Sequence, residues 1–398
     1  MAERTVYLDN SATTRLKGEV LDAMMPYFSG KFGNPSSLHT AGQDARKAIE
    51  STREKVVGFI GASSNREVIF TSGGTESDNI AIKASLEAGR KKNKKHIISS
   101  PIEHHAIIKT LQALKKAGGC ELDLVPVNEK GIVKVKELEK LIREDTCLIT
   151  IMLANNEIGT IQPIKEICEI AAKHKIPVHT DAVQALGKIP INVEELGISM
   201  LSASAHKFHG PKGIGLLYVK LGTPFTKQQT GGHHEWNRRA GTENVPGIIG
   251  FTKALELSVM HLDENAKKMS ALRDRLEKGI LEKVPETYVN GDTAKRLPNL
   301  SNIGFRYVEG EGIILSLDAE GISVASGSAC TSETLDPSHV LTAMGVSPEH
   351  AHGSIRFSLS TDITEKDIDY TISKVTAAIE RLRAMSPLYK QDAGGGGK

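Results

Sequence analysis

Long apolar runs, paired cysteines and an excess of charge of either sign are all missing from this sequence. The four cysteines, at positions 120, 147, 168 and 330, are too scattered for a disulfide framework, and no CxxC pair indicates a zinc site. No apolar stretch approaches the roughly 20 residues of a membrane helix, and the N-terminus lacks the apolar core of a signal peptide. These absences predict a cytoplasmic protein without a metal centre, in which any important cysteine acts alone.

Nucleotide and nucleic-acid signatures are missing as well. The formal net charge is only +2, which gives no electrostatic reason to expect nucleic acid or a membrane surface as a partner. The chain has neither a Walker motif nor a GxGxxG fingerprint. The sequence therefore favours a small-molecule site that does not bind a nucleotide.

From about residue 67 to 220, short apolar runs alternate with longer amphipathic stretches, which predicts a largely parallel sheet covered by helices on both faces. In such sheets the ligand lies beyond the carboxyl ends of the strands. Strands are predicted at 67–73, 95–100, 122–127, 147–153 and 176–181, and helices at 75–89, 104–117, 134–144 and 163–174.

A second, smaller lobe is expected beyond a polar, glycine-rich segment at 221–244. A single long helical pattern follows this segment, from about 246 to 282. We predict a large domain over 15–260, a small α+β domain formed by 1–14 and 261–390, and a glycine-rich tail over 391–398.

The stretch "VIFTSGGTESDN" runs from a strand through glycines into a helix. Free amide groups at the first turn, around Gly74 and Thr75, would suit a phosphate, but an ordinary capped helix start explains the residues equally well. His104 and His105 follow the next strand, and at most one of them can face a ligand. Asn155 and Asn156 follow another strand, where turn formation is the favoured explanation.

Asp181 ends the predicted strand 176–181, and Gln184 comes three residues later. Lys207 comes at the end of another apolar strand. An acid and a lysine at adjacent strand ends, facing a phosphate cradle, indicate pyridoxal phosphate: the lysine forms a Schiff base and the carboxylate pairs with the pyridine nitrogen. Ser204 and His206 are placed to donate hydrogen bonds to the phosphate. A structural lysine remains possible on its flanking residues alone.

Cys330 lies in "SVASGSACTSETLDP", among small polar residues that favour a loop over a packed core. A thiol there, close to a cofactor, indicates a nucleophile that moves between sites, whereas an incidental surface cysteine is the structural alternative. The other three cysteines lie in or beside apolar runs, which predicts buried and inert thiols.

Taken in order, the motifs resemble the cysteine desulfurases of the NifS/IscS kind, over nearly the whole chain. The form of the cysteine motif resembles the branch with a long catalytic loop. The motifs are "YLDNSATT", "FGNPSSLH", "TSGGTESDN", "EHHA", "NNEIGTIQPI", "HTDAVQ", "SAHKFHGPKG", "RRAGTENV", "SGSACTS" and "IRFSLS".

The resemblance implies the fold of the aspartate aminotransferase superfamily (fold type I), whose large domain has a mainly parallel seven-stranded sheet. It implies a homodimer that converts L-cysteine to L-alanine and passes the sulfur to an iron–sulfur scaffold protein or another acceptor. It assigns catalysis to Lys207, Cys330 and His104, with His104 over the pyridine ring and Cys330 taking the sulfur. It places the remaining cofactor and substrate contacts at Gly74, Thr75, Asn155, Asp181, Gln184, Ser204, His206, Thr242 of the partner subunit, and Arg356.

Three other functions compete with that of a cysteine desulfurase. Selenocysteine lyase or an aminotransferase would use the same scaffold, although transamination needs no loop cysteine. A metal-binding or sulfur-relay protein would use the histidine pairs as ligands, which is weak evidence for zinc without a fixed carboxylate or cysteine partner. The sequence also departs from the family pattern at His233, His234, Trp236 and Ala325. We expect these residues to alter the rim of the site or the dimer contact, and with it the choice of partner, without changing the chemistry.

Overall fold

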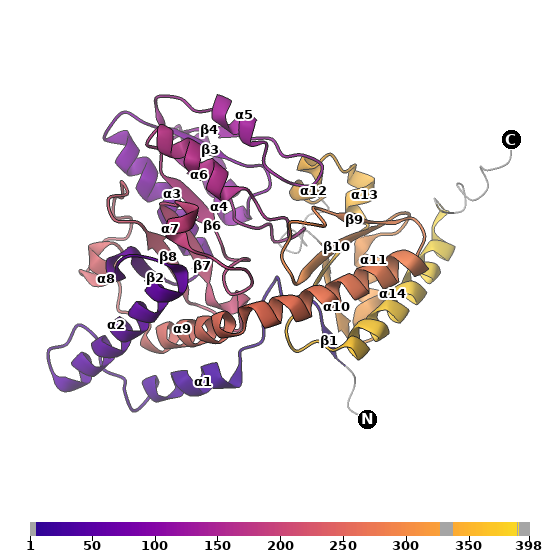
Figure 1. The fold of residues 1–398 in the computed structure, drawn as a ribbon, viewed down its shortest axis with the longest axis horizontal. Helices are drawn as coiled ribbons and strands as arrows, with labels where there is room; N and C mark the ends of the chain where they lie inside the picture. Colours follow the sequence, from indigo (N-terminus) through magenta and orange to yellow (C-terminus); the bar gives the residue numbers. More distant parts are fainter. Residues whose placement is uncertain (1–4, 327–336, 388, 390–398) are drawn as a thin grey trace.

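A mostly parallel sheet flanked by helices makes up one side of the molecule, and a smaller antiparallel sheet lies beside it (Figure 1). The computed structural model describes residues 5–326, 337–387 and 389. The predicted α/β architecture, with its seven-stranded sheet and smaller α+β part, is confirmed.

The large sheet has the strand order β2-β8-β7-β6-β5-β3-β4, and β8 alone runs antiparallel to its neighbours. Six of these strands were expected where they occur, including the one that ends before Lys207, and the seventh, β8, is the apolar run after it. The bounds are β2 Val68–Thr71, β3 His96–Ser99, β4 Glu121–Leu124, β5 Thr146–Thr150, β6 Val178–Asp181, β7 Met200–Ser204 and β8 Gly215–Val219.

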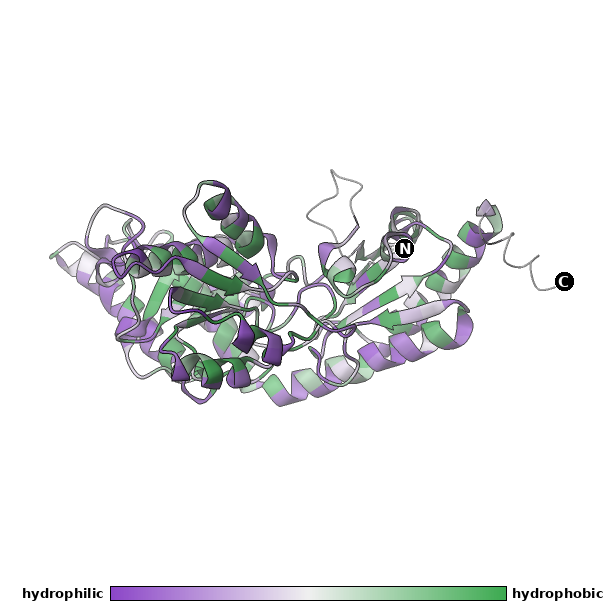
Figure 2. Ribbon diagram, turned by 90° about the horizontal axis from the view of Figure 1, so that it is seen from above, coloured by the Kyte–Doolittle hydropathy of each residue, from purple (hydrophilic) through white to green (hydrophobic). Residues whose placement is uncertain are grey.

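Both faces of this sheet are buried, because helices cover each of them. Successive strand residues point to opposite faces, and they join different hydrophobic clusters. Ile97 and Leu148 pack in one cluster, whereas their neighbours Ile98 and Ile149 pack in the other. This explains why the strands read as continuous apolar runs and not as alternating ones. The apolar strands and the polar outer faces of the helices are visible in Figure 2.

The covering helices follow the predicted amphipathic stretches. In α6, Ile164, Ile167, Cys168 and Ala171 are buried at helical spacing and face the sheet. The expected helix at 134–144 is shorter than predicted. The bounds are α1 Gly18–Met24, α2 Thr40–Ile60, α3 Gly74–Arg90, α4 His105–Lys116, α5 Val135–Lys140, α6 Ile164–Lys173, α7 Val193–Leu196, α8 His234–Asn237 and α9 Val245–Met260.

A four-stranded antiparallel sheet of order β12-β13-β10-β9 forms the second layer with its own hydrophobic cluster. The N-terminal strand β1, Val6–Tyr7, pairs in parallel with β11, Ile322–Ser323, so the chain begins beside this layer. The other bounds are β9 Thr287–Asn290, β10 Leu300–Phe305, β12 Ala325–Ser326, β13 Ser354–Ser358, α10 Leu262–Lys283, α11 Gly310–Asp318, α12 His339–Ala343, α13 Pro348–His352 and α14 Glu365–Met385.

The prediction of one long helix over 246–282 is wrong at His261. The backbone there, at φ −116° and ψ 21°, leaves the helical region and separates α9 from α10. The two helices pack in different hydrophobic clusters. Phe251 of α9 belongs to the cluster of the large sheet, and Leu276 of α10 belongs to that of the small sheet. The domain boundaries themselves stay a prediction, because Leu341, beyond residue 261, also packs in the large cluster.

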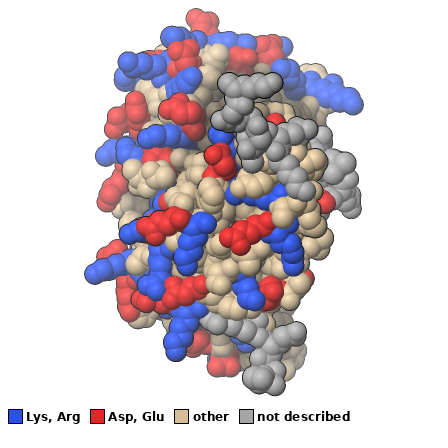
Figure 3. Space-filling model, turned by 90° about the vertical axis from the view of Figure 1, so that its right-hand side faces the viewer, with Lys and Arg blue, Asp and Glu red and all other residues tan. Residues whose placement is uncertain are grey.

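Charges of both signs are interspersed on the face of the molecule that Figure 3 shows. Ion pairs join charges of opposite sign between elements of the small layer: Arg275 of α10 contacts Asp369 of α14 at 2.8 Å, and Lys374 of α14 contacts Glu320. This face therefore offers no field of one sign. Among the described residues, no helix combines the length and the apolar character that crossing a membrane requires.

We predict that Gly215→Ala lowers the free energy of unfolding by about 1–3 kcal/mol, because overpacking is costly where the backbone cannot retreat. A Cβ at Gly215 would lie 2.6 Å from the carbonyl carbon of Gly73 and 2.8 Å from the carbonyl oxygen of Ala203. Gly58 of α2 is exposed with open space around it, so Gly58→Ala should instead raise stability by about 0.5–1 kcal/mol. Urea denaturation measures both, and equal midpoints for the two variants would contradict the prediction.

Candidate active site

A cavity of about 340 Å³ opens at the carboxyl ends of β6 and β7, between the large sheet and the small one. This is the edge of the sheet where sequence analysis expected the ligand. The structure brings nine of the predicted site residues into its wall: Gly74, Thr75, His104, Asp181, Gln184, Ser204, His206, Lys207 and Arg356.

Lys207 reaches the cavity from the short 3-10 turn, Ala205–Lys207, that directly follows β7. Its Nζ donates hydrogen bonds to the backbone carbonyls of Ser11 (2.5 Å) and Ala12 (2.8 Å). The N-terminal segment is thereby fastened to the end of the large sheet, and the lysine amine is held at one point of the cavity wall. Gln184 donates to the same carbonyl of Ser11, at 2.9 Å.

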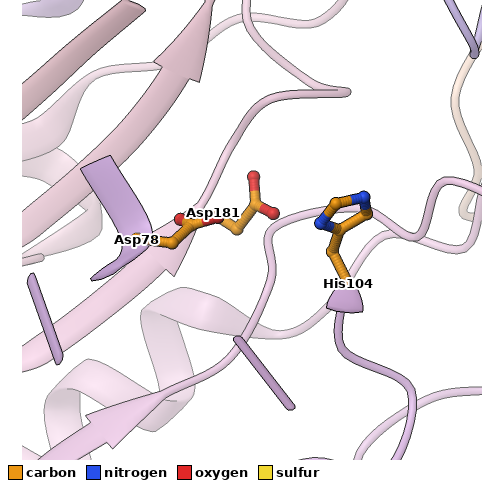
Figure 4. A group of neighbouring side chains, drawn as sticks. All are labelled: Asp78, His104 and Asp181. Atoms are coloured by element: carbon orange, nitrogen blue, oxygen red, sulfur yellow. The ribbon is translucent and has the colours of Figure 1, made fainter. Parts of the chain in front are cut away.

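Asp181, Asp78 and His104 converge on the same place, with their donor atoms within 4.8 Å of one another (Figure 4). Asp181 ends β6, Asp78 lies in α3 and His104 precedes α4. Burial raises the pKa of Asp181 to about 6, while the N–H of Val183, at 2.8 Å, and the charge of Lys207 oppose that rise. Asp181 is therefore mostly ionised at neutral pH.

Asp78 is the partner of Asp181 that sequence analysis missed. Its side chain is 1% exposed, and its Oδ1 has no hydrogen-bond partner among the described residues. Burial and the nearby charge of Asp181 raise its pKa well above the ordinary value. Two carboxyl groups this close in a dry site do not both ionise, so Asp78 keeps the proton and Asp181 keeps the charge. The only sequence signal was its place in "TSGGTESDN".

The histidines around the lysine are neutral. Burial and the charge of Lys207 lower the pKa of His104 to about 4 and that of His206 to about 4. Nδ1 of His104 accepts a hydrogen bond from the N–H of Ala106 at 3.1 Å, which leaves the proton on Nε2. His206 approaches Thr13 Oγ1 at 3.1 Å. The cavity thus holds uncharged imidazole rings beside a cationic amine and a carboxylate.

The start of α3 lies at the cavity and has the features of an anion cradle, one of the two explanations that the sequence left open. The first amides of a helix have no partner within it, and the helix dipole favours negative charge there. A Cβ on Gly74 would lie only 2.7 Å from Val183 Cγ2, so a side chain would fill the cradle. Ser204 and His206 complete its wall. These features suit a phosphate group.

Arg356 enters the cavity from β13 of the small sheet. Its guanidinium donates to Asp9 Oδ1 at 2.8 Å and to the carbonyl of Asn156 at 3.1 Å, and it is 3% exposed. Its Nε has no hydrogen-bond partner among the described residues. An immobilised guanidinium in a cavity wall is a receptor for a carboxylate.

Two predicted residues lie elsewhere, and a third falls outside the described part of the chain. Asn155 does not line the cavity: its amide donates to Ile102 O at 2.9 Å and its Oδ1 accepts from two backbone amides, whereas Asn156 does line it. Thr242 lines a separate pocket beside β2 and α8. Cys330 lies outside the described residues. Their functional roles stay predictions.

The three described cysteines are buried, as the apolar runs predicted. Burial raises the pKa of Cys147 and of Cys168 to about 12, so neither thiol ionises near neutral pH. These thiols are not nucleophiles.

Comparison with known proteins gives one consistent family. The profile of the aminotransferase class-V family matches residues 6–371. The chain is 51% identical over 390 residues to the cysteine desulfurase IscS of Dictyoglomus turgidum (strain DSM 6724 / Z-1310), covering 98% of both chains. A solved NifS-like protein is similar with a TM-score of 0.89 and 41% identity, over 95% of this chain and all of that one. The solved SspA in complex with cysteine matches with a TM-score of 0.80 and 35% identity, over 89% and 99%.

We predict that Glu103→Gln removes part of the pH dependence of stability. Glu103 is buried, and burial raises the pKa of its carboxyl to about 8 although Ser100 and the N–H of Met152 hydrogen-bond to it. Between pH 4.5 and about 8 the folded protein holds a proton that the unfolded chain releases, so stability falls as pH rises, by up to about 1.4 kcal/mol per pH unit.

Urea denaturation at pH 5 and pH 8 measures this slope. The variant should lose less stability than the wild type between the two values, because its amide does not titrate. Glu129→Gln, which changes an exposed carboxyl, is the control. An unchanged slope in Glu103→Gln would show that Glu103 is ionised in the folded protein.

Proposed function

Because the chain belongs to the class-V aminotransferase family and is a cysteine desulfurase, we propose that it converts L-cysteine to L-alanine and holds the sulfur as a persulfide on Cys330. One observation carries this assignment of the site. A lysine amine, an ionised carboxylate, a neutral imidazole and an immobilised guanidinium all face one cavity, beside a cradle for an anion.

Pyridoxal 5′-phosphate fits this donor set. Lys207 would hold its aldehyde carbon, Asp181 its ring nitrogen, Gln184 its ring hydroxyl and His104 the face of its ring. The ring nitrogen is protonated when it pairs with a carboxylate, and Asp181 is the member of its carboxyl pair that carries the charge. The phosphate would lie in the cradle, held by Gly74, Thr75, Ser204, His206 and the partner subunit's Thr242.

When bound, this cofactor supplies an electron-withdrawing ring that makes the α-proton of the substrate acidic. Arg356 orients the substrate through its carboxylate. The resemblance assigns Asn155 to the same task, which requires its side chain to give up bonds to the carbonyl of Ile102 or to the amides of Glu157 and Ile158. Lys207, once its amine is free, removes the α-proton as a general base and returns protons to the carbon skeleton. His104 stays uncharged and does not compete with Lys207 for an anion.

The sulfur step needs a thiolate and an acceptor for the electron pair of the breaking carbon–sulfur bond, which the electron-withdrawing ring of the cofactor would supply. Cys330 attacks the sulfur of the substrate and forms an S–S bond, while the carbon–sulfur bond breaks and leaves its electron pair on the substrate skeleton. Protonation of that skeleton completes alanine. The protein retains a persulfide, so a partner can collect sulfur without the release of free sulfide.

A homodimer is supported by apolar side chains that are exposed in one chain. Leu38 is 91% exposed, Phe32 76% and Phe28 58%, and all three lie between α1 and the start of α2. Such a patch on one chain favours a second copy as its cover. In the dimer, Thr242 would complete the phosphate cradle of the partner.

The acceptor of the sulfur is proposed from the family, as an iron–sulfur scaffold protein or another sulfur carrier in the cytoplasm. The relative from Dictyoglomus turgidum is named IscS. The exposed side chains of Leu315 and Met385 lie on α11 and at the end of α14. Met385 belongs to the segment 381–389, which we propose as part of the contact, and Arg381 of this segment donates to Ser316, the neighbour of Leu315.

We predict that the wild type, mixed with L-cysteine, forms alanine and protein-bound persulfide. Cys330→Ala should keep its cofactor colour and lose desulfuration by at least about 100-fold, because its nucleophile is missing. Lys207→Ala should lose the covalently bound form of the cofactor. Alanine is measured by amino-acid analysis and persulfide by mass spectrometry. Alanine formation at the wild-type rate by Cys330→Ala would contradict the role of this cysteine.

We also predict that the double variant Phe32→Glu, Leu38→Glu sediments as a monomer, because four charges per dimer would be buried in the contact. Leu315→Glu, which places the same charge on an exposed position of α11, should leave the dimer intact. Analytical ultracentrifugation distinguishes the two. A double variant that remains dimeric would place the contact elsewhere.

A further inference from the structure

The anion cradle at the start of α3 has a carboxylate in its wall. Glu76 lies in the first turn of α3 and lines the cradle together with Ser72, Gly73 and Thr75. Its side chain is 19% exposed, so water and salt screen its charge only in part. A carboxylate in this place repels a phosphate dianion unless another group compensates its charge.

Glu76 also shapes the turn that precedes the helix. Its Oε2 accepts a hydrogen bond from the N–H of Ser72 at 2.6 Å. The carbonyl of Gly73, next along the turn, accepts from the hydroxyl groups of Thr71 and Ser77, both at 3.2 Å. Glu76 is therefore a part of the scaffold of the cradle as well as a source of negative charge in it.

Arg239 compensates the charge of Glu76. Its Nε donates to Glu76 Oε1 at 2.8 Å and its Nη2 donates to Oε2 at 3.3 Å, so the guanidinium binds the carboxylate through two nitrogens. Burial raises the pKa of Glu76, but the hydrogen bonds from Arg239 and Ser72 outweigh this effect and hold the pKa below its ordinary value. The carboxylate in the cradle wall is thus ionised and paired.

The segment that carries Arg239 is itself fastened to the large sheet. Glu235 of α8, four residues earlier, accepts from Arg53 Nη1 and Nη2 at 2.8 and 3.0 Å and from the N–H of Phe70 in β2 at 3.0 Å. Glu235 and Trp236 have φ values of 46° and 58°, in the left-handed region that such residues rarely adopt. The buried bonds of Glu235 hold the segment in this conformation, from which Arg239 reaches α3.

We propose that Arg239 is a positioning residue for cofactor binding: by pairing with Glu76 it removes the repulsion between this carboxylate and the cofactor phosphate, while Glu76 keeps its bond to Ser72. The inference rests on the function proposed above, in which the phosphate lies at Gly74 and Thr75. Arg239 does not line the cradle and acts through Glu76. Loss of Arg239 therefore weakens the binding of a phosphorylated cofactor and not that of the same ring without its phosphate.

The test compares pyridoxal 5′-phosphate with pyridoxal, which has the same ring and aldehyde but no phosphate. The cofactor is removed from the full-length holoenzyme, and each compound is titrated back while the absorbance of the bound form is followed. Arg239→Met should raise the dissociation constant of pyridoxal 5′-phosphate by about 10-fold or more, because an unpaired carboxylate then faces the phosphate. Its dissociation constant for pyridoxal should stay within about 2-fold of the wild-type value.

Two further variants separate charge from structure. The double variant Glu76→Gln, Arg239→Met removes both charges and keeps an acceptor oxygen for the N–H of Ser72, so it should return to within about 3-fold of the wild-type affinity for pyridoxal 5′-phosphate. Arg238→Met removes the same charge one residue earlier, where the guanidinium donates to the carbonyl of Arg66, and should stay within about 2-fold. Circular dichroism and melting temperatures show whether each variant is folded.

Three outcomes would overturn the inference. Wild-type affinity of Arg239→Met for pyridoxal 5′-phosphate would show that the pair is not needed, and equal weakening of both compounds would show a general distortion of the site. A double variant as weak as Arg239→Met would show that the charge of Glu76 is not the cause. A wild-type protein that binds no pyridoxal 5′-phosphate would refute the proposed function itself, which the wild-type titration alone reveals.

Discussion

The parallel arrangement of β5, β6 and β7 is the constraint on which the site depends. Parallel strands end at the same edge, so the residues that follow them meet there although they are far apart in sequence. Asp181 ends β6, and Lys207 follows β7 by three residues. Burial of both sheet faces by apolar residues keeps this edge rigid, which is what a site with fixed distances needs.

Burial of the side chains at that edge decides which of them are protonated. Burial makes charge costly, so the carboxyl with the better partners keeps it: Asp181, which accepts from Val183 N–H and lies near Lys207, is ionised, and Asp78 is not. The same effect keeps His104 neutral. The cavity therefore confines its charge to a few groups whose positions are fixed by the backbone.

The small sheet supplies the part of the cavity wall that the large sheet lacks. Arg356 is brought from β13 and is held by Asp9, while Lys207 binds the carbonyls of the same N-terminal segment. The cavity thus depends on three parts of the chain: the N-terminal segment, the end of the large sheet and β13. Asp9 and Arg356 are almost 350 residues apart in the sequence. A change in the packing of the small sheet would displace Arg356, which β13 carries, whereas Asp181 and Lys207 are held by the large sheet.

The sequence by itself determined the alternating strands and helices, the strand-end positions of Asp181 and Lys207, and the order of motifs that marks the family, because these features are local or follow from chain order. It did not reveal Asp78, although this residue lies in one of the motifs that mark the family. It also misjudged His261, where the backbone leaves the helical region and α9 and α10 pack in different clusters. Only the tertiary structure decided which buried polar groups face one another, because burial and pairing of charges arise from contacts across the whole chain.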